Sequence, residues 1–229
     1  IRDYYASRGL GDVYKRQQTH YAFTCGDVDL KVTFTAPLFM EDLKLLSRPV
    51  NYLTYSVAAR DGREHEVEVY FEASPRWALD QPYQQSASKG YEADGLLYLK
   101  SGSKEQNILA KQGDDLRIDW GYFYMVAGKE NTAYSVGNST ELRKNFVNGT
   151  LNSASLEGED SNGNMALVRS HGKVKNVTDK IMLGYDDIYS IQYFGTNLRP
   201  YWNSKGDRTI EAEMLAAYNE YDKLLARCY

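Results

Sequence analysis

Apolar and polar residues alternate along much of the first half of the chain, between about residues 19 and 126. In the clearest run, residues 66–72 read EVEVYFE, and runs of the same period occur at residues 30–35 and 52–57. A period of two places one face of a strand on a core and the other toward water, as in antiparallel sheets. Several short strands with turns between them predict a mainly β chain folded as an antiparallel β-sandwich.

A turn signal separates two of these runs at Asp61-Gly62. Asp-Gly supplies the positive φ angles of a tight two-residue turn, so we predict a β-hairpin here. Further strands are predicted at residues 96–100, 108–110 and 116–126. In the last of these, one face carries six apolar or aromatic side chains, namely Leu116, Ile118, Trp120, Tyr122, Tyr124 and Val126.

The pattern becomes helical in parts of the second half. Within residues 135–147, a helix is predicted to start with Ser139 or Thr140 as its cap. Residues 148–164 are rich in Asn, Ser and Gly and predict a surface loop and a boundary region. Residues 209–228 predict a long helix with an apolar stripe at intervals of three and four, formed by Ile210, Met214, Ala217, Tyr221, Leu224 and Cys228. A lone amphipathic helix must bury its stripe, and we expect its partner to be missing from the chain.

These changes divide the chain into three parts. Residues 1–17 lack the apolar stretch of a signal peptide and resemble translated adapter sequence from environmental sequencing, so we expect an artefactual or disordered tail. A genuine polar arm is the alternative. Residues 18–172 are expected to form the sandwich, and residues 173–229 the truncated start of a helical domain.

Composition and charge narrow the classes of function. The chain has 31 acidic and 27 basic residues among 229, and this mild acidity argues against a nucleic-acid partner. No apolar run approaches the roughly 18 residues of a membrane span. Cys25 and Cys228 lack metal-type spacing and are predicted to be buried thiols, with a disulfide as the alternative in an oxidising compartment. No motif for a metal or a cofactor is found, so we expect neither.

The clearest candidate for chemistry is the block between residues 185 and 202, which combines two aspartates and an arginine with six of the chain's aromatic residues. Aromatic faces and carboxylates suit a cleft for a polar organic substrate. We predict Asp186 and Asp187 as catalytic candidates, although neighbouring residues point apart on a strand and do not form one facing pair. The predicted substrate-binding residues are Tyr185, Tyr189, Tyr193, Arg199, Tyr201 and Trp202. An aromatic domain interface is the alternative interpretation.

A second dense block, DDLRIDWG, occupies residues 114–121. Charges beside a tryptophan can line a site. More commonly such charges close a hairpin and hold its strands, and that structural role is the interpretation we favour.

Taken together and in order, these blocks resemble the glutaminase A family. The resemblance covers residues 18–229 and is carried by the runs at 33–38 (TFTAPL), 41–43 (EDL), 46–53 (LSRPVNYL), 61–67 (DGREHEV), 70–74 (YFEAS), 113–122 (GDDLRIDWGY), 183–196 (LGYDDIYSIQYFGT) and 199–202 (RPYW). It implies a β-sandwich-like domain followed by a six-helical-hairpin toroid. It also implies an exported enzyme, extracellular or periplasmic, that hydrolyses L-glutamine to L-glutamate and ammonia.

Under this resemblance, residues 185–202 open the toroid and residues 209–228 form its first long helix, while most of the toroid lies beyond residue 229 as a partner in cis. The resemblance supplies no catalytic residue, so the candidates above follow from chemistry, with Arg199 as a partner for the substrate's carboxylate. The fragment itself is expected to be inactive. Two other functions stay open: a carbohydrate-binding or glycoside-hydrolase-associated sandwich, and a support module whose sandwich only stabilises the toroid.

Overall fold

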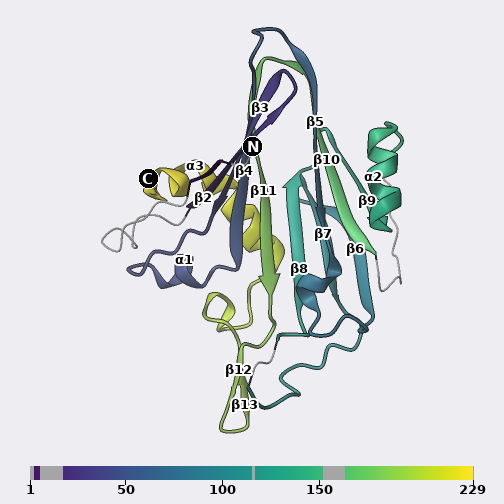
Figure 1. Ribbon diagram of the computed structural model, residues 1–229. Coiled ribbons are helices and arrows are strands. Elements are labelled where there is room, and N and C mark those ends of the chain that lie inside the picture. Colours follow the sequence, from purple (N-terminus) through teal and green to yellow (C-terminus); the bar gives the residue numbers. More distant parts are fainter. Residues whose placement is uncertain (1–2, 6–17, 115–116, 152–162, 229) are drawn as a thin grey trace.

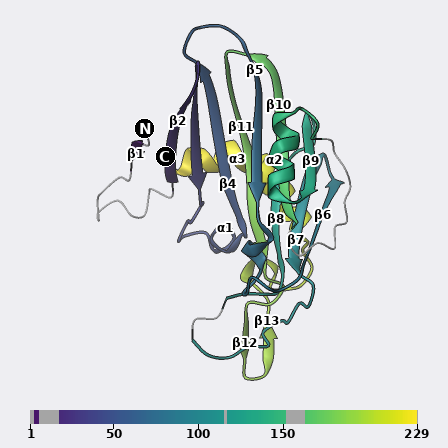
Figure 2. The same cartoon turned by 45° about the vertical axis from the view of Figure 1, so that its right-hand side comes forward.

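The computed structural model describes residues 3–5, 18–114, 117–151 and 163–228. These residues form two packed β-sheets with a helix on each outer face (Figure 1). The fold is mainly β and its sheets are antiparallel, as the alternating sequence pattern predicts. Turning the view brings the smaller sheet and helix α2 forward, with helix α3 behind the larger sheet (Figure 2).

The larger sheet has eight strands within the described residues, in the order β1-β2-β3-β4-β11-β8-β7-β6. Its strands are β1 (Asp3–Tyr5), β2 (Gln18–Cys25), β3 (Val28–Thr35), β4 (Val50–Ala59), β6 (Ser86–Ala93), β7 (Leu96–Ser103), β8 (Tyr122–Gly128) and β11 (Asn176–Asp186). A short helix, α1 (Leu43–Ser47), lies between β3 and β4. The expected domain boundary after residue 172 falls within β10 (Asn164–Val174), and the next strand, β11, is hydrogen-bonded between β4 and β8.

The smaller sheet has the order β5-β10-β9 and is formed by β5 (His65–Ala73), β10 (Asn164–Val174) and β9 (Thr132–Gly137). Helix α2 (Ser139–Val147) lies on its outer face, where the rings of Phe146 and Tyr70 are 4.9 Å apart. The side chain of Asn138, one residue before the predicted caps, accepts the N–H of Thr140 and caps the helix. Most of the predicted loop at 148–164 lies outside the described residues.

The chain crosses between the two sheets at Asp61-Gly62, which leads from β4 to β5, and at Val174–Asn176, which leads from β10 to β11. Gly62 has the positive φ angle, +72°, that the Asp-Gly signal predicts. The predicted hairpin is nevertheless wrong, because β4 pairs with β3 and β11 while β5 pairs with β10. A tight Asp-Gly hairpin does occur at Asp94-Gly95, where φ is positive at both residues and β6 pairs directly with β7.

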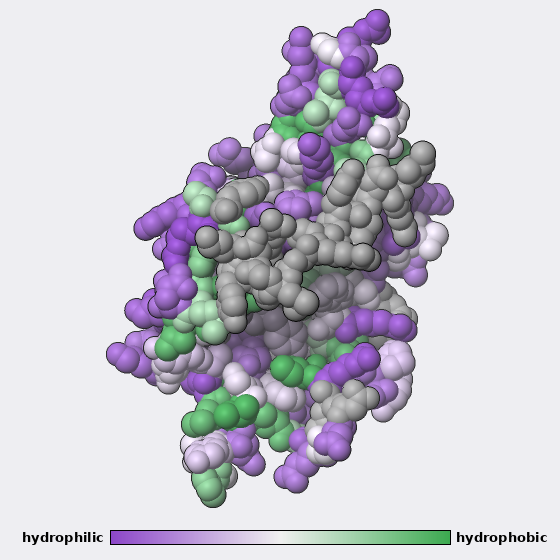
Figure 3. All heavy atoms as spheres, turned by 60° about the vertical axis from the view of Figure 1, so that its left-hand side comes forward, coloured by the Kyte–Doolittle hydropathy of each residue, from purple (hydrophilic) through white to green (hydrophobic). Residues whose placement is uncertain are grey.

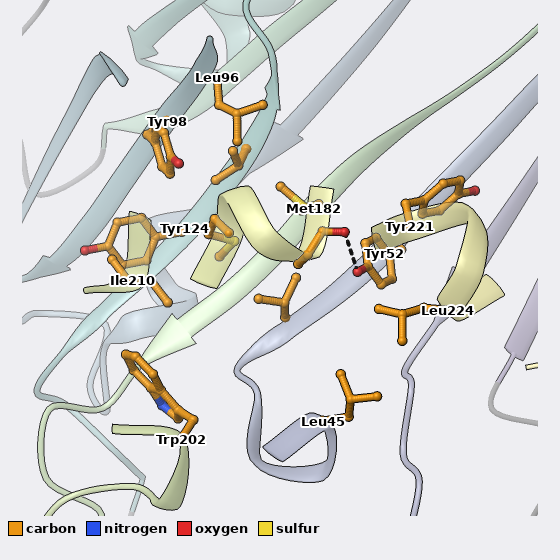
Figure 4. Packing of buried hydrophobic residues seen from close by; sticks show 14 residues of the cluster. Leu45, Tyr52, Leu96, Tyr98, Tyr124, Met182, Trp202, Ile210, Tyr221 and Leu224 are labelled. Atoms are coloured by element: carbon orange, nitrogen blue, oxygen red, sulfur yellow. Dashed lines mark hydrogen bonds between the residues drawn. The ribbon is translucent and has the colours of Figure 1, made fainter. Parts of the chain in front are cut away.

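Alternation along β4 divides its side chains between two cores. Leu53 and Tyr55 point toward the smaller sheet and pack with residues such as Met165 and Leu167. Tyr52, on the opposite face, belongs to the cluster under helix α3 (Figure 4). The central strands of the larger sheet are therefore buried on both faces, which is why they are rich in large apolar side chains.

Helix α3 (Ile210–Cys228) covers the outer face of the larger sheet, with Thr209 accepting the N–H of Ala212 at its start. The six residues of the predicted stripe are all buried. Their partners come from β4, β7, β8 and β11, so the expectation that the partner is missing was wrong. The stripe packs on a strand surface that includes Tyr98, Tyr124 and Met182. The periodicity of the sequence could not predict this partner, because it does not indicate which face of a sheet a helix covers.

Three further predictions need correction. Residues 108–110 form a turn and no strand. The strand predicted at 116–126 begins only at Tyr122, after Gly121 with its φ of +78°. Its predicted face is confirmed for Tyr124 and Val126, whereas Leu116 lies outside the described residues. Cys25 is exposed, although Cys228 is buried as predicted, and the two thiols are free.

The remaining elements gather at one end of the sandwich. A 3-10 turn, η1 (Pro75–Ala78), follows β5. The hairpin of β12 (Ile191–Tyr193) and β13 (Thr196–Leu198) forms the lowest part of the molecule in Figure 1. A second 3-10 turn, η2 (Tyr201–Asn203), leads toward α3. These elements lie where β8 begins and β11 ends, and both blocks of candidate residues are found there.

Candidate functional site

The two candidate blocks meet at this end of the larger sheet. The hydroxyl of Tyr185 donates to the main-chain oxygen of Trp120 at 2.6 Å. The indole Nε1 of Trp120 donates in turn to the main-chain oxygen of Tyr189 at 2.9 Å. Because both contacts involve one side chain and one backbone oxygen, they fix the path of each block against the other.

Gly121 permits this close approach. A Cβ atom at this position would lie 2.2 Å from the main-chain oxygen of Asp186 and 2.9 Å from the Cα of Asp187. Its φ of +78° is also a conformation that side chains with a Cβ rarely adopt. The glycine therefore serves both the turn before β8 and the contact with the end of β11.

Asp186 and Asp187 accept different hydrogen bonds in the turn after β11. Oδ1 of Asp186 accepts the N–H of Ile188 at 3.0 Å, and Oδ2 of Asp187 accepts the hydroxyl of Ser190 at 2.6 Å. Burial raises the pKa of Asp186, and the neighbouring charge of Asp187 raises it further. Asp186 is thus the half-buried carboxyl whose proton is held more tightly, while Asp187 stabilises the turn.

Lys100 lies near Asp186 on the helix-α3 face of the sheet. Its Nζ is 3.6 Å from the ring centroid of Tyr122 and 5.6 Å from that of Tyr124. Burial lowers the pKa of Lys100, and so does the charge of Lys89, its partner across β6 and β7. The sequence analysis missed this ammonium group, because a lysine in a strand becomes informative only when its cross-strand and aromatic neighbours are known.

Glu211 adds a second carboxylate to this region from the first turn of α3. The hydroxyl of Tyr91 donates to its Oε1 at 2.7 Å, and the charge of Glu211 opposes the burial of Lys100 by raising the pKa of the amine. A half-buried amine, two carboxyl groups and phenolic hydroxyls therefore share one end of the helix-covered face. Such groups can donate, accept or transfer protons.

Asp119 has a structural position in the second block. Its side chain is buried, and Oδ2 accepts hydrogen bonds from Lys111 Nζ at 2.7 Å and from Gln84 Nε2 at 2.9 Å. Lys111 also binds Asp80 at 2.9 Å. The favoured structural role of this block agrees with these contacts, although the charges join loops and do not close a hairpin. Oδ1 of Asp119 has no partner among the described residues.

The other predicted residues do not converge on one cleft. The guanidinium of Arg199 stacks over the ring of Tyr189, with its Cζ 4.8 Å from the ring centroid. Tyr193 is exposed on the β12–β13 hairpin, next to Phe194. Tyr201 and Trp202 line a pocket of about 270 Å³ between α1 and the turn before α3. Trp202 is 4% exposed and belongs to the core beneath α3.

No group of three or more His, Cys, Asp or Glu side chains in the described part is arranged to hold a metal ion. No helix in that part combines the length and the apolar character needed to cross a membrane.

The chain is thus a two-sheet β domain whose candidate groups lie at one end of the strands. Residues 17–229 match a family described as a domain of unknown function, DUF5127, and the chain belongs to that family. It is also 27% identical over 195 residues to a protein named Glutaminase A from Aspergillus oryzae, which indicates a distant relationship. That match covers 80% of this chain but 27% of the Aspergillus protein, so the chain spans about a quarter of that relative's length.

Proposed function

We propose that this chain is the N-terminal part of a glutaminase-A-like amidohydrolase that converts L-glutamine to L-glutamate and ammonia. The observation that carries the proposal is the similarity to Glutaminase A across four fifths of the chain. Because most of that relative has no counterpart here, we assign the chemical step to the complete protein. The chain alone is expected to be inactive.

Within this proposal the sandwich supports a helical domain. The β12–β13 hairpin favours such a role, because its apolar side chains are turned outward. Phe194 at its tip is 90% exposed and has a φ of +44°, a conformation that is strained for a residue with a Cβ. Figure 3 shows apolar residues gathered at this lower end of the molecule. An exposed and strained aromatic tip is understandable if another part of the protein covers it.

The candidate residues are given roles by the chemistry of amide hydrolysis, which needs proton transfer and a grip on the substrate's charged groups. We propose Asp186 for proton transfer, since burial raises its pKa toward the range of an effective general acid or base. We propose Asp187 as a positioning residue through Ser190, and Arg199 as a partner for a carboxylate. Tyr185 and Tyr189, both in contact with Trp120, contribute to the surrounding walls in this proposal.

The test is ammonia release from L-glutamine by a full-length enzyme that contains this domain. Asp186→Asn is expected to lower kcat sharply, and Asp187→Asn to lower it while thermal unfolding stays close to that of the parent. Asp27→Asn, an exposed aspartate at the opposite end of the sandwich, is the matched control. No ammonia release by the parent enzyme would overturn the proposed reaction. Normal turnover in both variants would remove these aspartates from it.

The alternative is a carbohydrate-binding sandwich, and exposed aromatic rings at the same end favour it. Trp77 in η1 and Tyr83 after it are both exposed. Aromatic faces can stack on sugar rings. Saturable oligosaccharide binding by the 229-residue chain, lost in Trp77→Ala, would support this function over the glutaminase proposal. Export from the cell is part of both proposals.

A further inference from the structure

A small pocket lies between α1, η2 and the turn that precedes α3. Its volume is about 270 Å³, and its walls include Tyr201, Trp202 and Ser204. Trp202 is held by the core on one side, where Ile210 is its neighbour in the cluster (Figure 4). One wall of the pocket is therefore a fixed aromatic ring, and the volume suits a molecule the size of an amino acid.

Charged side chains line the rest of this pocket, namely Lys44, Lys205, Arg208 and Asp207. Arg208 is already used, because its guanidinium binds Glu213. Lys44, Lys205 and Asp207 have no ion-pair partner among the residues that the structure describes. The walls of the pocket thus include two lysines and one aspartate that are exposed and have no ion-pair partner within the described chain.

Two of the neighbouring arginines, Arg48 and Arg208, are paired with carboxylates. Arg48 binds Glu213 at 3.1 Å and Glu220 at 2.8 Å, so Arg48 and Arg208 together face two carboxylates. The acidic residues before α1, Glu41 and Asp42, are paired with Arg227. The excess positive charge therefore belongs to Lys44, Lys205 and Arg199. The Nε of Arg199 would lie 3.0 Å from a Cβ at Gly206, and Arg199 has no ion-pair partner among the described residues.

We propose that this pocket binds an acidic α-amino acid. Such a ligand carries two carboxylates and one ammonium group, which complement two lysines and one aspartate in number and sign. The carboxylates would bind Lys44 and Lys205, and the ammonium group would bind Asp207. The ligand's net negative charge also suits a pocket whose lining and neighbouring side chains carry an excess of positive charge. The inference goes beyond the proposed reaction and rests only on the groups lining the pocket.

The indole N–H of Trp202 provides a direct measurement. It is buried and has no acceptor among the described residues, whereas Trp120 donates to Tyr189 and Trp77 is exposed. In ¹H–¹⁵N spectra of the 229-residue chain, the indole signal of Trp202 is expected to shift saturably as L-glutamate is added. The other two indole signals should stay in place and report that the fold is unchanged.

Calorimetry with L-glutamate, glutarate, L-glutamine and inorganic phosphate then identifies the recognised groups. Lys44→Ala or Lys205→Ala is expected to raise the Kd for L-glutamate about tenfold, since each removes a charge-assisted contact. Lys31→Ala, which removes an exposed lysine from β3, should leave it unchanged. Asp207→Asn should weaken L-glutamate but not glutarate, which lacks the ammonium group.

Three results would overturn the proposal: no saturable shift of the Trp202 signal, phosphate binding as tightly as L-glutamate, or an equal loss of affinity in Lys31→Ala. These experiments involve no catalysis. Failure of the pocket proposal and failure of the glutaminase proposal are therefore separate outcomes.

Discussion

The hydroxyl of Tyr52 donates a hydrogen bond to the main-chain oxygen of Ala217, with an O···O distance of 2.8 Å. Tyr52 lies on β4 and Ala217 in the middle of α3, so the contact joins the helix to the larger sheet. Two residues further along the strand, the hydroxyl of Thr54 lies 2.6 Å from that of Tyr221. The interface under α3 thus combines apolar packing with buried polar contacts that fix the position of the helix.

Removing the first of these contacts should weaken the fold measurably. Tyr52→Phe keeps the ring in the core and deletes only the buried hydroxyl, so the free energy of unfolding is expected to fall by about 1 kcal/mol. Urea denaturation followed by circular dichroism measures this change. Tyr193→Phe, at an exposed position, should alter it by less than about 0.5 kcal/mol. Equal effects in the two variants would contradict a role for the Tyr52 hydroxyl in holding α3.

At Gly184, the side chain of Met214 on α3 packs closely against the backbone of β11. A Cβ there would lie 2.2 Å from Cε of Met214 and 2.5 Å from the main-chain oxygen of Pro49. The methionine end can move but the backbone oxygen cannot, so Gly184→Ala is expected to cost about 1–3 kcal/mol. Gly137→Ala is the control, because its nearest neighbour would be an ordinary contact at 3.9 Å. If the Gly184→Ala variant unfolded at the same midpoint temperature as the parent, the close packing at Gly184 would be contradicted.

Arg48 holds the buried carboxylate of Glu213 beneath the edge of α3. Both side chains are largely buried, whereas Glu220, the second partner of Arg48, is half exposed. Replacing the arginine by methionine leaves Glu213 with Arg208 alone in a poorly hydrated position, and we expect a loss of about 3 kcal/mol. Glu220→Gln should cost less than about 1 kcal/mol, and added salt should reduce that smaller effect. Denaturation at low and high salt distinguishes the two contributions.

Asp186 predicts a particular dependence of stability on pH. Burial raises its pKa above the ordinary value of 3.8, so the folded state holds the proton more tightly than the unfolded state. Stability from this group is present below the unfolded pKa and is lost as pH rises through the folded pKa. Asp186→Asn should therefore unfold with a higher free energy than the parent at neutral pH. The difference should shrink as pH falls toward the ordinary value.

The measurement is urea denaturation of both proteins at several pH values, with Asp27→Asn as the control for removing a carboxylate charge. A variant that gains nothing at neutral pH would contradict the cost of ionising Asp186. If the variant gains stability but loses activity in the full-length enzyme, the carboxylate would be retained for function at the expense of stability.

Local sequence patterns predicted strands and turns better than they predicted pairing. Asp61-Gly62 and Asp94-Gly95 are the same dipeptide, yet only the second joins two paired strands. The dipeptide determines the backbone angles of the turn. It does not determine the partner of the following strand, which depends on contacts with residues far away in the sequence. The hairpin at Asp94-Gly95 had the same signal and was not predicted.

The candidate site was predicted in its parts but not in its assembly. Residues 185–202 and 114–121 stood out by composition, and the Tyr185–Trp120 contact brings them together. These two residues are 65 positions apart, so no local pattern indicates that they meet. Lys100 was missed because its neighbours, Tyr122 and Tyr124, surround it only after β7 and β8 have paired.

The position of β11 has a consequence for biosynthesis. This strand is made late in the chain but lies between β4 and β8, both made much earlier. Until residue 186 has left the ribosome, β4 and β8 each present an unpaired edge in what becomes the middle of the sheet. Such edges are sites of aggregation. During synthesis this domain therefore depends on a late strand to cover these edges, and a truncation before Asn176, which removes β11, leaves them unpaired.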